Sequence, residues 1–331
     1  MLTHWQLLLK EVVTSPIELL TQLNLDADLL PAAQQAAKLF PLRVPQGFIS
    51  RMKKGDPDDP LLRQVLPLAE EALESPDFTQ DPLNESAVNP IPGLLHKYYG
   101  RVLITLVGAC AINCRYCFRR HFPYQKNIPG KAAWKNIVAY LANNNTIFEV
   151  ILSGGDPLLA QDEYLKACIH DLASIPHLKI LRIHSRLPIV LPQRITLNLL
   201  EVLTSTTLQP VMVVHCNHSN ELDDSVSAAI ALLQEKKIIV FNQSVLLKGV
   251  NDSVEALVHL SQRLVAIGIV PYYLHLLDKV QGAAHFAVDE IKAGQLIAGM
   301  QNRIAGYLVP KLVKEEAGAT AKQSIAMVTL P

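Results

Sequence analysis

Three cysteines lie within one short stretch of the sequence, Cys110, Cys114 and Cys117, with the spacing C-x3-C-x2-C. Thiolates at this density bind metal, and a structural zinc site or a fully ligated iron–sulfur cluster uses four protein ligands. His121 could complete a Cys3His zinc site. Three cysteines without a fourth nearby favour instead a [4Fe–4S] cluster with one iron open to a ligand from outside the protein. The spacing therefore predicts an enzyme with an unusual metal cofactor.

A second motif, Ser153-Gly154-Gly155-Asp156, directly follows an apolar run at residues 148–152. Glycines without a Cβ atom let a ligand approach the backbone closely. The same four residues could also form an ordinary tight turn between a strand and a helix. Next to the cysteine loop, the motif indicates a binding site for the polar tail of a cofactor.

Predicted strands and helices, which must position these motifs, alternate along the last two thirds of the chain. Apolar runs rich in β-branched residues predict six strands, at residues 102–107, 148–152, 180–183, 211–214, 238–241 and 269–277. Helical periodicity follows each strand, at residues 132–141, 162–173, 196–203, 223–234, 254–267 and 289–304. Most strands begin about 30 residues after the previous one, the length of a βα unit. The pattern predicts an α/β fold with a parallel sheet.

Polar residues and glycines follow nearly every predicted strand. In a barrel the carboxyl ends of all strands meet at one mouth, whereas in a doubly wound open sheet only those near the switch point meet. Polar sets after six strands therefore favour a barrel or partial barrel. No GxGxxG motif follows the first strand, which argues against a dinucleotide-binding fold.

The N-terminal third has a different character. Short amphipathic helices are predicted at residues 16–23 and 30–40, a longer one at 61–73 with a kink at Pro67, and a loop at 82–92. We therefore expect three parts: an N-terminal helical extension (1–95), the partial barrel (96–305) and a short C-terminal segment (306–331).

The cysteine and glycine motifs together resemble those of the radical S-adenosylmethionine (SAM) superfamily. The resemblance implies a partial (β/α)6 barrel in which Cys110, Cys114 and Cys117 bind a [4Fe–4S] cluster. It also implies that SAM chelates the open iron and that residues Ser153, Gly154, Gly155 and Asp156 bind SAM.

Further motifs resemble the lysine 2,3-aminomutase family over residues 93–322. They are the pair Arg119-Arg120, His184-Ser185-Arg186-Leu187-Pro188, the run 242–251 beginning Asn242-Gln243-Ser244, and Pro271-Tyr272-Tyr273. That family carries a second cofactor, pyridoxal 5′-phosphate (PLP), bound covalently through a lysine. Lys322 stands at the matching position, although the family's preceding glycine run is missing here. By itself Lys322 would be taken as a surface lysine.

The resemblance also implies roles for charged residues. Arg119 matches the anchor of the substrate carboxylate, and a guanidinium suits bidentate binding. Asp278 and Glu315 match the two anchors of the ε-ammonium group, with Glu315 in place of the family's aspartate. Each of these three could instead be a structural or solvated residue. Arg186 and Arg101, with Lys97, are candidates for binding the phosphate of PLP. We expect His215, His218 and Gln243 to line the mouth.

The reaction implied is a radical 1,2-amino shift on L-lysine, started by hydrogen abstraction from C3. The run Gly55-Asp56-Pro57-Asp58-Asp59-Pro60-Leu61-Leu62-Arg63-Gln64, with only nine residues after Lys322, resembles a short bacterial branch of the family. That branch makes (R)-β-lysine for the β-lysylation of elongation factor P by a separate lysyl ligase. An electron donor such as flavodoxin or ferredoxin is expected as a partner.

Two alternatives remain open at the level of sequence. One is a free-standing aminomutase that acts on lysine or another amino acid, such as glutamate. The other is a non-catalytic metal-binding module that docks on a translation factor.

Composition limits the remaining classes. The chain has 331 residues, half of them hydrophobic, and a formal net charge of zero, so a sizeable core is available and nucleic-acid binding is not expected. No apolar run reaches the roughly 20 residues of a membrane span. Five cysteines, three of them clustered, do not suggest a disulfide framework, and with no signal peptide recognised they predict a cytoplasmic protein.

Overall fold

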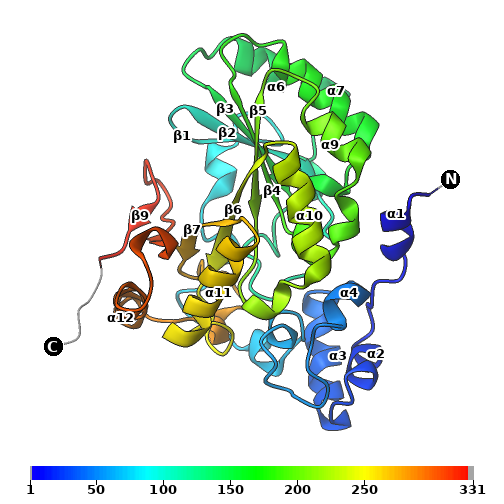
Figure 1. Cartoon of the computed structure of the whole chain (residues 1–331), viewed down its shortest axis with the longest axis vertical. Coiled ribbons are helices and arrows are strands. Elements are labelled where there is room, and N and C mark those ends of the chain that lie inside the picture. Colours follow the sequence, from blue (N-terminus) through cyan, green and yellow to red (C-terminus); the bar gives the residue numbers. More distant parts are fainter. Residues whose placement is uncertain (1, 327–331) are drawn as a thin grey trace.

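The computed structural model describes residues 2–326, which form helices around one nine-stranded sheet (Figure 1). The strands lie in the sheet in the same order as in the sequence. They are β1 (Leu94–Tyr98), β2 (Arg101–Val107), β3 (Glu149–Gly154), β4 (Ile180–Ser185), β5 (Gln209–Val214), β6 (Ile239–Val245), β7 (Val270–His275), β8 (Lys311–Lys314) and β9 (Gln323–Ser324).

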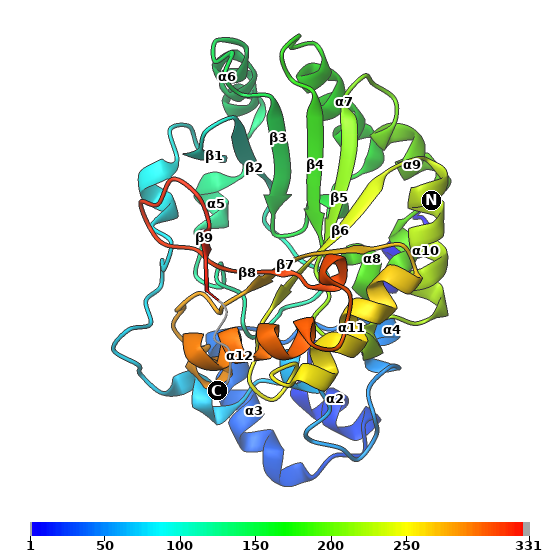
Figure 2. The ribbon, with the colours of Figure 1, turned by 60° about the vertical axis from the view of Figure 1, so that its left-hand side comes forward.

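The pairing of the strands decides between the two predicted architectures. β2 to β8 pair in parallel with their neighbours, while β1 and β9 pair antiparallel at the two ends. A doubly wound sheet reverses its strand order at a switch point, and this sheet does not. Among the described residues β1 and β9 do not pair with each other, so the sheet curves without closing (Figure 2). The predicted partial barrel is confirmed.

Helices return the chain between the parallel strands, close to the predicted ranges. Side chains of Asp223, Ser253 and Asp289 accept hydrogen bonds from the first turns of three of them, which fixes where those helices begin. The six are α6 (Lys131–Ala142), α7 (Asp162–Ala173), α9 (Leu197–Leu203), α10 (Asp224–Glu235), α11 (Val254–Ala266) and α12 (Glu290–Gln301). Shorter elements lie in the connections: α5 (Tyr124–Asn127), α8 (Leu187–Val190), η5 (Pro157–Leu159), η6 (Pro192–Arg194), η7 (Ser219–Glu221), η8 (Ala284–Phe286) and η9 (Gly306–Leu308).

The N-terminal extension consists of short helices joined by irregular chain, and α2 to α4 lie together at one end of the molecule (Figure 1). The helix predicted at residues 61–73 is wrong, because two separate 3-10 turns stand there. Pro67 has no N–H group and disfavours a helical residue before it, so the two turns cannot join. The elements are α1 (His4–Leu8), α2 (Pro16–Gln22), η1 (Ala27–Leu29), α3 (Leu30–Leu39), α4 (Gln46–Ile49), η2 (Leu62–Gln64), η3 (Ala69–Ala72) and η4 (Glu85–Val88).

The extension shares its hydrophobic core with the barrel. Buried residues from Trp5 to Leu66 belong to the same cluster as those of β2 to β6 and their helices. The C-terminal segment also joins the barrel, because β8 extends the parallel sheet and β9 pairs with β8. Residues 327–331 of the predicted C-terminal segment lie outside the described residues. No helix within residues 2–326 is long and apolar enough to span a membrane.

Candidate active site

A cavity of about 700 Å³ lies inside the curved sheet, lined at the carboxyl ends of the parallel strands and also, through residues such as Arg101 and Glu149, at their amino ends. The residues predicted to do chemistry line it from several directions. They include Cys110, Cys114, Cys117, Arg119, Ser153, Gly154, Gly155, Asp156, Arg101, Arg186, Asp278, Glu315 and Lys322. The structure therefore brings the predicted residues together around one cavity, with Arg101 at the amino end of β2 and not at the carboxyl end of a strand.

The cysteine loop, residues 110–117, takes its shape from the N-terminal extension. The backbone N–H of Asn113 donates to the carbonyl of Arg43 at 2.9 Å, and that of Arg115 donates to the carbonyl of Gln64 at 2.9 Å. The Arg115 guanidinium, itself buried, donates to both oxygens of the equally buried Glu71 carboxylate. Arg120 adds a second ion pair to Glu71. Residues far upstream thus hold the cysteines in place.

The loop suits a cluster better than a single ion. Among residues 2–326, no three Cys, His, Asp or Glu side chains are arranged to hold one metal ion. A [4Fe–4S] cluster binds each thiolate through a different iron, so its cysteines need not converge on one point. The imidazole of His121 lies 3.3 Å from the carbonyl of Gln281 and does not line the cavity, which removes the Cys3His zinc alternative. Burial raises the pKa of Cys110 and raises that of Cys117 to about 11.

The glycine motif packs directly against the cysteine loop. A Cβ atom at Gly155 would lie 2.3 Å from the carbonyl oxygen of Ala109, and one at Gly154 would lie 2.4 Å from that of Val107. The backbone N–H groups of Gly155 and Asp156 donate to Val107 and Ala109 at 2.6 and 2.8 Å. The glycines are therefore required by contact between two backbones, whatever ligand they also meet.

Asp156 has most of its hydrogen-bonding capacity satisfied within the protein. Its carboxylate accepts from the Ser185 hydroxyl at 2.7 Å and from the backbone N–H groups of Arg186, Leu187 and Leu158 at 2.8 to 3.1 Å. Burial nevertheless raises its pKa to about 6. Asp156 thus fixes the turn after β4 against the turn after β3.

Arg119 is held on several sides. Its Nε and Nη2 donate to the two carboxylate oxygens of Glu85 at 2.8 and 2.6 Å, and Nη1 donates to the Ser153 hydroxyl at 3.3 Å. The rings of Phe118 and Phe122 lie 4.8 and 5.7 Å from its Cζ. Sequence reasoning missed Glu85, which stands in a stretch without periodicity that was predicted to be a loop.

Lys322 and Glu315 face each other across the β8–β9 connection and form an ion pair. Lys97 of β1 approaches the other oxygen of Glu315 at 3.1 Å. Burial would raise the pKa of Glu315, but the two ammonium groups outweigh it and lower that pKa to about 2. Burial lowers the pKa of Lys322 although Glu315 opposes the shift. Its Nζ lies 5.6 Å from the centre of the Tyr273 ring. A largely buried amine with a lowered pKa is suited to bond to a carbonyl cofactor.

Asp278 follows β7 and lines the same cavity. Burial, and then the charge of Glu315, raise its pKa to about 7. Two carboxylates with such different pKa values stand near one amine, Lys322. The arrangement can accept an additional cation, because binding one would ionise Asp278 fully.

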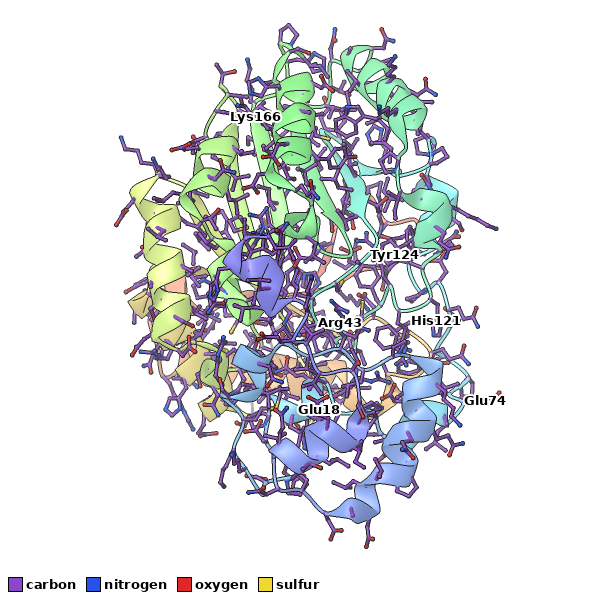
Figure 3. The ribbon with its side chains drawn as sticks, turned by 90° about the vertical axis from the view of Figure 1, so that its right-hand side faces the viewer. Glu18, Arg43, Glu74, His121, Tyr124 and Lys166 are labelled. Carbon is purple, nitrogen blue, oxygen red and sulfur yellow. The ribbon has the colours of Figure 1, made fainter. Side chains whose placement is uncertain are left out.

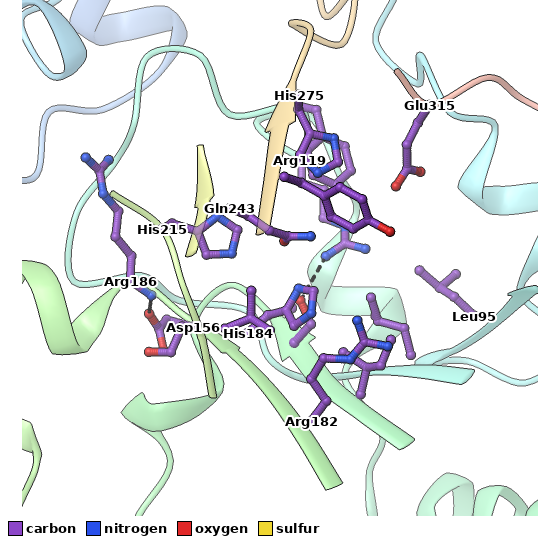
Figure 4. A pocket seen from close by; sticks show the side chains of 18 of the residues that line it. Leu95, Arg119, Asp156, Arg182, His184, Arg186, His215, Gln243, His275 and Glu315 are labelled. Carbon is purple, nitrogen blue, oxygen red and sulfur yellow. Dashed lines mark hydrogen bonds between the residues drawn. The ribbon is translucent and has the colours of Figure 1, made fainter. Parts of the chain in front are cut away.

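Arg186 does not lie where the phosphate prediction needs it. Its Nη1 donates to the Cys114 sulfur at 2.7 Å, and its Nη2 donates to Gln64 and Glu221 at 2.6 and 3.0 Å. Figure 4 shows it on the side of Asp156, away from Glu315. Arg101 lines the cavity with Lys322 and has its Cζ 4.7 Å from the Tyr98 ring. Arg101 therefore remains a candidate for binding the phosphate, and so does Lys97, which lines the same cavity and pairs with Glu315.

Three histidines face the cavity, and two had been given no role. His215 and Gln243 line it as predicted, whereas His218 does not and instead accepts from the backbone N–H of Asn220. His184 and His275 join them (Figure 4). Burial lowers the pKa of all three, that of His215 to about 4, so they are neutral near pH 7.

This chain is similar in sequence to known proteins that share its cysteine motif region and to others that match nearly its whole length. A family model described as a 4Fe-4S single cluster domain matches residues 99–182. A protein of Escherichia coli named L-lysine 2,3-aminomutase is 51% identical, over 96% of this chain and 93% of its own length. The Haemophilus influenzae protein of that name is 49% identical over 96% and 94%. The Clostridium subterminale protein of that name is 37% identical over 88% and 70%.

Proposed function

Because this chain belongs to the L-lysine 2,3-aminomutase family of radical SAM enzymes, we propose that it moves the amino group of L-lysine from C2 to C3 and releases β-lysine. One observation carries the proposal for this chain's own residues. Arg119 and a set of acids, Asp278 and Glu315, line one cavity together with the cysteine loop and Lys322. Lysine carries a carboxylate at one end and an ammonium group at the other, and this cavity offers a partner for each.

The residues present fit three cofactors. The cysteine loop would hold the [4Fe–4S] cluster, the Ser153–Asp156 turn would bind SAM beside it, and Lys322 with Arg101 would bind PLP. When bound, the cluster and SAM supply a carbon radical, and PLP supplies a carbonyl and π-system that carry the migrating amine.

The protein's part is placement. Arg119 would bind the substrate carboxylate, and Asp278 and Glu315 would bind the ε-ammonium group, so that both ends of lysine are fixed and C3 is presented to the radical. Glu315, which pairs with Lys322 here, would pair instead with the ε-ammonium group of the substrate. The neutral histidines add no further positive charge beside the incoming ammonium group.

The test uses full-length enzyme reconstituted anaerobically with iron, sulfide, SAM, PLP and dithionite. We expect Lys322→Ala to retain its iron, to lose the near-ultraviolet absorption of bound PLP and to lose turnover of lysine. Lys311→Ala, at an exposed lysine of the neighbouring strand β8, is the matched control and should behave as the unsubstituted enzyme. Zinc in place of iron, or PLP absorption that survives Lys322→Ala, would refute the proposal.

The nearest alternative is an aminomutase for another amino acid, such as glutamate. The acidic lining favours a cationic side chain, since Asp278, Glu315 and Glu85 would all repel a second carboxylate. Labelled lysine and glutamate offered separately to the same enzyme decide between them. Turnover of glutamate without lysine would overturn the substrate assignment.

We further propose that the product is (R)-β-lysine for the β-lysylation of elongation factor P, with reducing electrons from a flavodoxin or ferredoxin. The support is the resemblance of residues 55–64 to the short family branch. Intact-mass spectrometry of elongation factor P from cells with and without this gene tests the link. An unchanged mass would leave a free-standing aminomutase.

A further inference from the structure

The substrate anchor Arg119 is itself anchored by the N-terminal extension. Residues 78–89, here called the strap, cross the cavity wall between two attachment points. At one end the backbone of Thr79 exchanges two hydrogen bonds with Lys279 and Gln281, both 2.9 Å long. At the other end the side chain of Asn89 is hydrogen-bonded to that of Asn127. Between them Leu83, Glu85 and Val88 line the cavity.

Glu85 is the charged residue of the strap that reaches Arg119. Asp81 accepts from the backbone N–H of Glu85 at 3.0 Å and so fixes the turn that carries it. The Glu85 and Arg119 side chains are 12% and 7% exposed, so their ion pair is largely withdrawn from water. Such a pair, with two charge-assisted hydrogen bonds in one plane, fixes the orientation of a guanidinium as well as neutralising it.

The N–H groups of Arg119 that Glu85 does not occupy determine what else this arginine can bind. A guanidinium has five N–H donors in a fixed plane and two edges that can each bind a carboxylate bidentately. Glu85 takes the edge formed by Nε and Nη2, and the edge between Nη1 and Nη2 is left with one contact, from Nη1 to Ser153. A second carboxylate can therefore bind Arg119 without displacing Glu85.

We propose that Glu85 is a positioning residue for the substrate: it holds one edge of Arg119 so that the other edge receives the carboxylate of lysine. The inference rests on the proposed function and gives the strap a part in it. Glu85 does not touch the reacting atoms; it acts through Arg119.

The experiment compares Glu85→Gln and Glu85→Asp with Asp77→Asn, which removes an acid from an exposed ion pair just before the strap. Loss of a hydrogen bond to a charged group predicts a rise of about ten- to hundredfold in the KM for lysine with Glu85→Gln, and a smaller rise with Glu85→Asp. Cadaverine, which keeps the α- and ε-amines of lysine but has no carboxylate, should inhibit all the variants with the same constant. A purely structural role would weaken cadaverine as well.

Calorimetric binding of lysine to the same proteins separates the two proposals. Unsubstituted enzyme that binds lysine but does not turn it over would count against the proposed function, while the effect of Glu85→Gln on binding still tests Glu85. An unchanged or lowered KM and dissociation constant in Glu85→Gln overturns the inference, as does an equal loss of cadaverine affinity.

Discussion

At the scale of single residues, the site pairs opposite charges before any substrate arrives. Arg119 is balanced by Glu85, and Lys322 and Lys97 are balanced by Glu315. Asp278 differs from these acids, because burial raises its pKa to about 7 and it is therefore only partly ionised near neutral pH. Burial raises the pKa of Asp278 most. The nearby carboxylates of Glu315 and Glu85 raise it further, and the ammonium groups of Lys322 and Lys97 lower it.

This arrangement predicts that the KM for lysine depends on pH. The pKa of Asp278 is about 7, and an ammonium group binds its ionised form, so binding below that pH must first displace a proton. Each pH unit below 7 should raise the KM by up to about tenfold. Steady-state kinetics from pH 6 to 8 measure the slope. Asp278→Asn should have a weaker but nearly constant KM, and an equal slope in that variant would contradict the assignment.

At the scale of elements, the strand ends bring the chemistry together, and the turns after β2 and β3 must pack backbone to backbone. The strands that sequence periodicity predicts are long and buried on both faces. It misses β1, which has five residues, and it misses β8 with four residues and β9 with two, which are too short to show a period. Yet Glu315 and Lys322 lie in the connection between β8 and β9, and family motifs were needed to find both residues.

The contact between the two turns gives a test at this scale. Gly155→Ala forces Ala109 to move, because the new Cβ would lie 2.3 Å from its carbonyl oxygen, and Ala109 adjoins Cys110. We expect the variant to lose most of its iron after reconstitution and about 1–3 kcal/mol of stability. Gly130→Ala, where no atom lies within 4 Å of the added Cβ, should keep both. A Gly155→Ala enzyme with its full complement of iron would show that the cysteine loop tolerates the displacement.

At the scale of the whole molecule, the N-terminal extension is part of the active enzyme. Sequence analysis could assign the extension no chemistry, because only single residues of it, within short or irregular elements, contact the site residues and the cysteine loop. These residues are Gln64, Glu71 and Glu85. None of these has a periodic signal, and their partners lie far along the sequence. The barrel, by contrast, followed from regular spacing, as did the cysteine loop, whereas the resemblance to the family was needed for Arg119, Asp278, Glu315 and Lys322.

Glu71 tests the dependence of the barrel on the extension. Glu71→Gln leaves the buried Arg115 and Arg120 without their counter-ion, which should cost about 3–5 kcal/mol. Chemical unfolding of the metal-free protein measures the loss. Glu74→Gln changes an exposed acid three residues away (Figure 3) and should stay within about 0.5 kcal/mol of the parent. Equal stability of the two variants would mean that the extension only rests on the barrel.

The contacts between residues 41–64 and the cysteine loop also bear on the order in which the enzyme is built. A ribosome makes the chain from its N-terminus, so the backbone groups of Arg43 and Gln64 are present before the cysteines that they orient. Glu315 and Lys322 emerge more than one hundred and ninety residues after Cys117. Synthesis thus supplies the cysteine loop and its scaffold before the part of the cavity wall that carries Glu315 and Lys322.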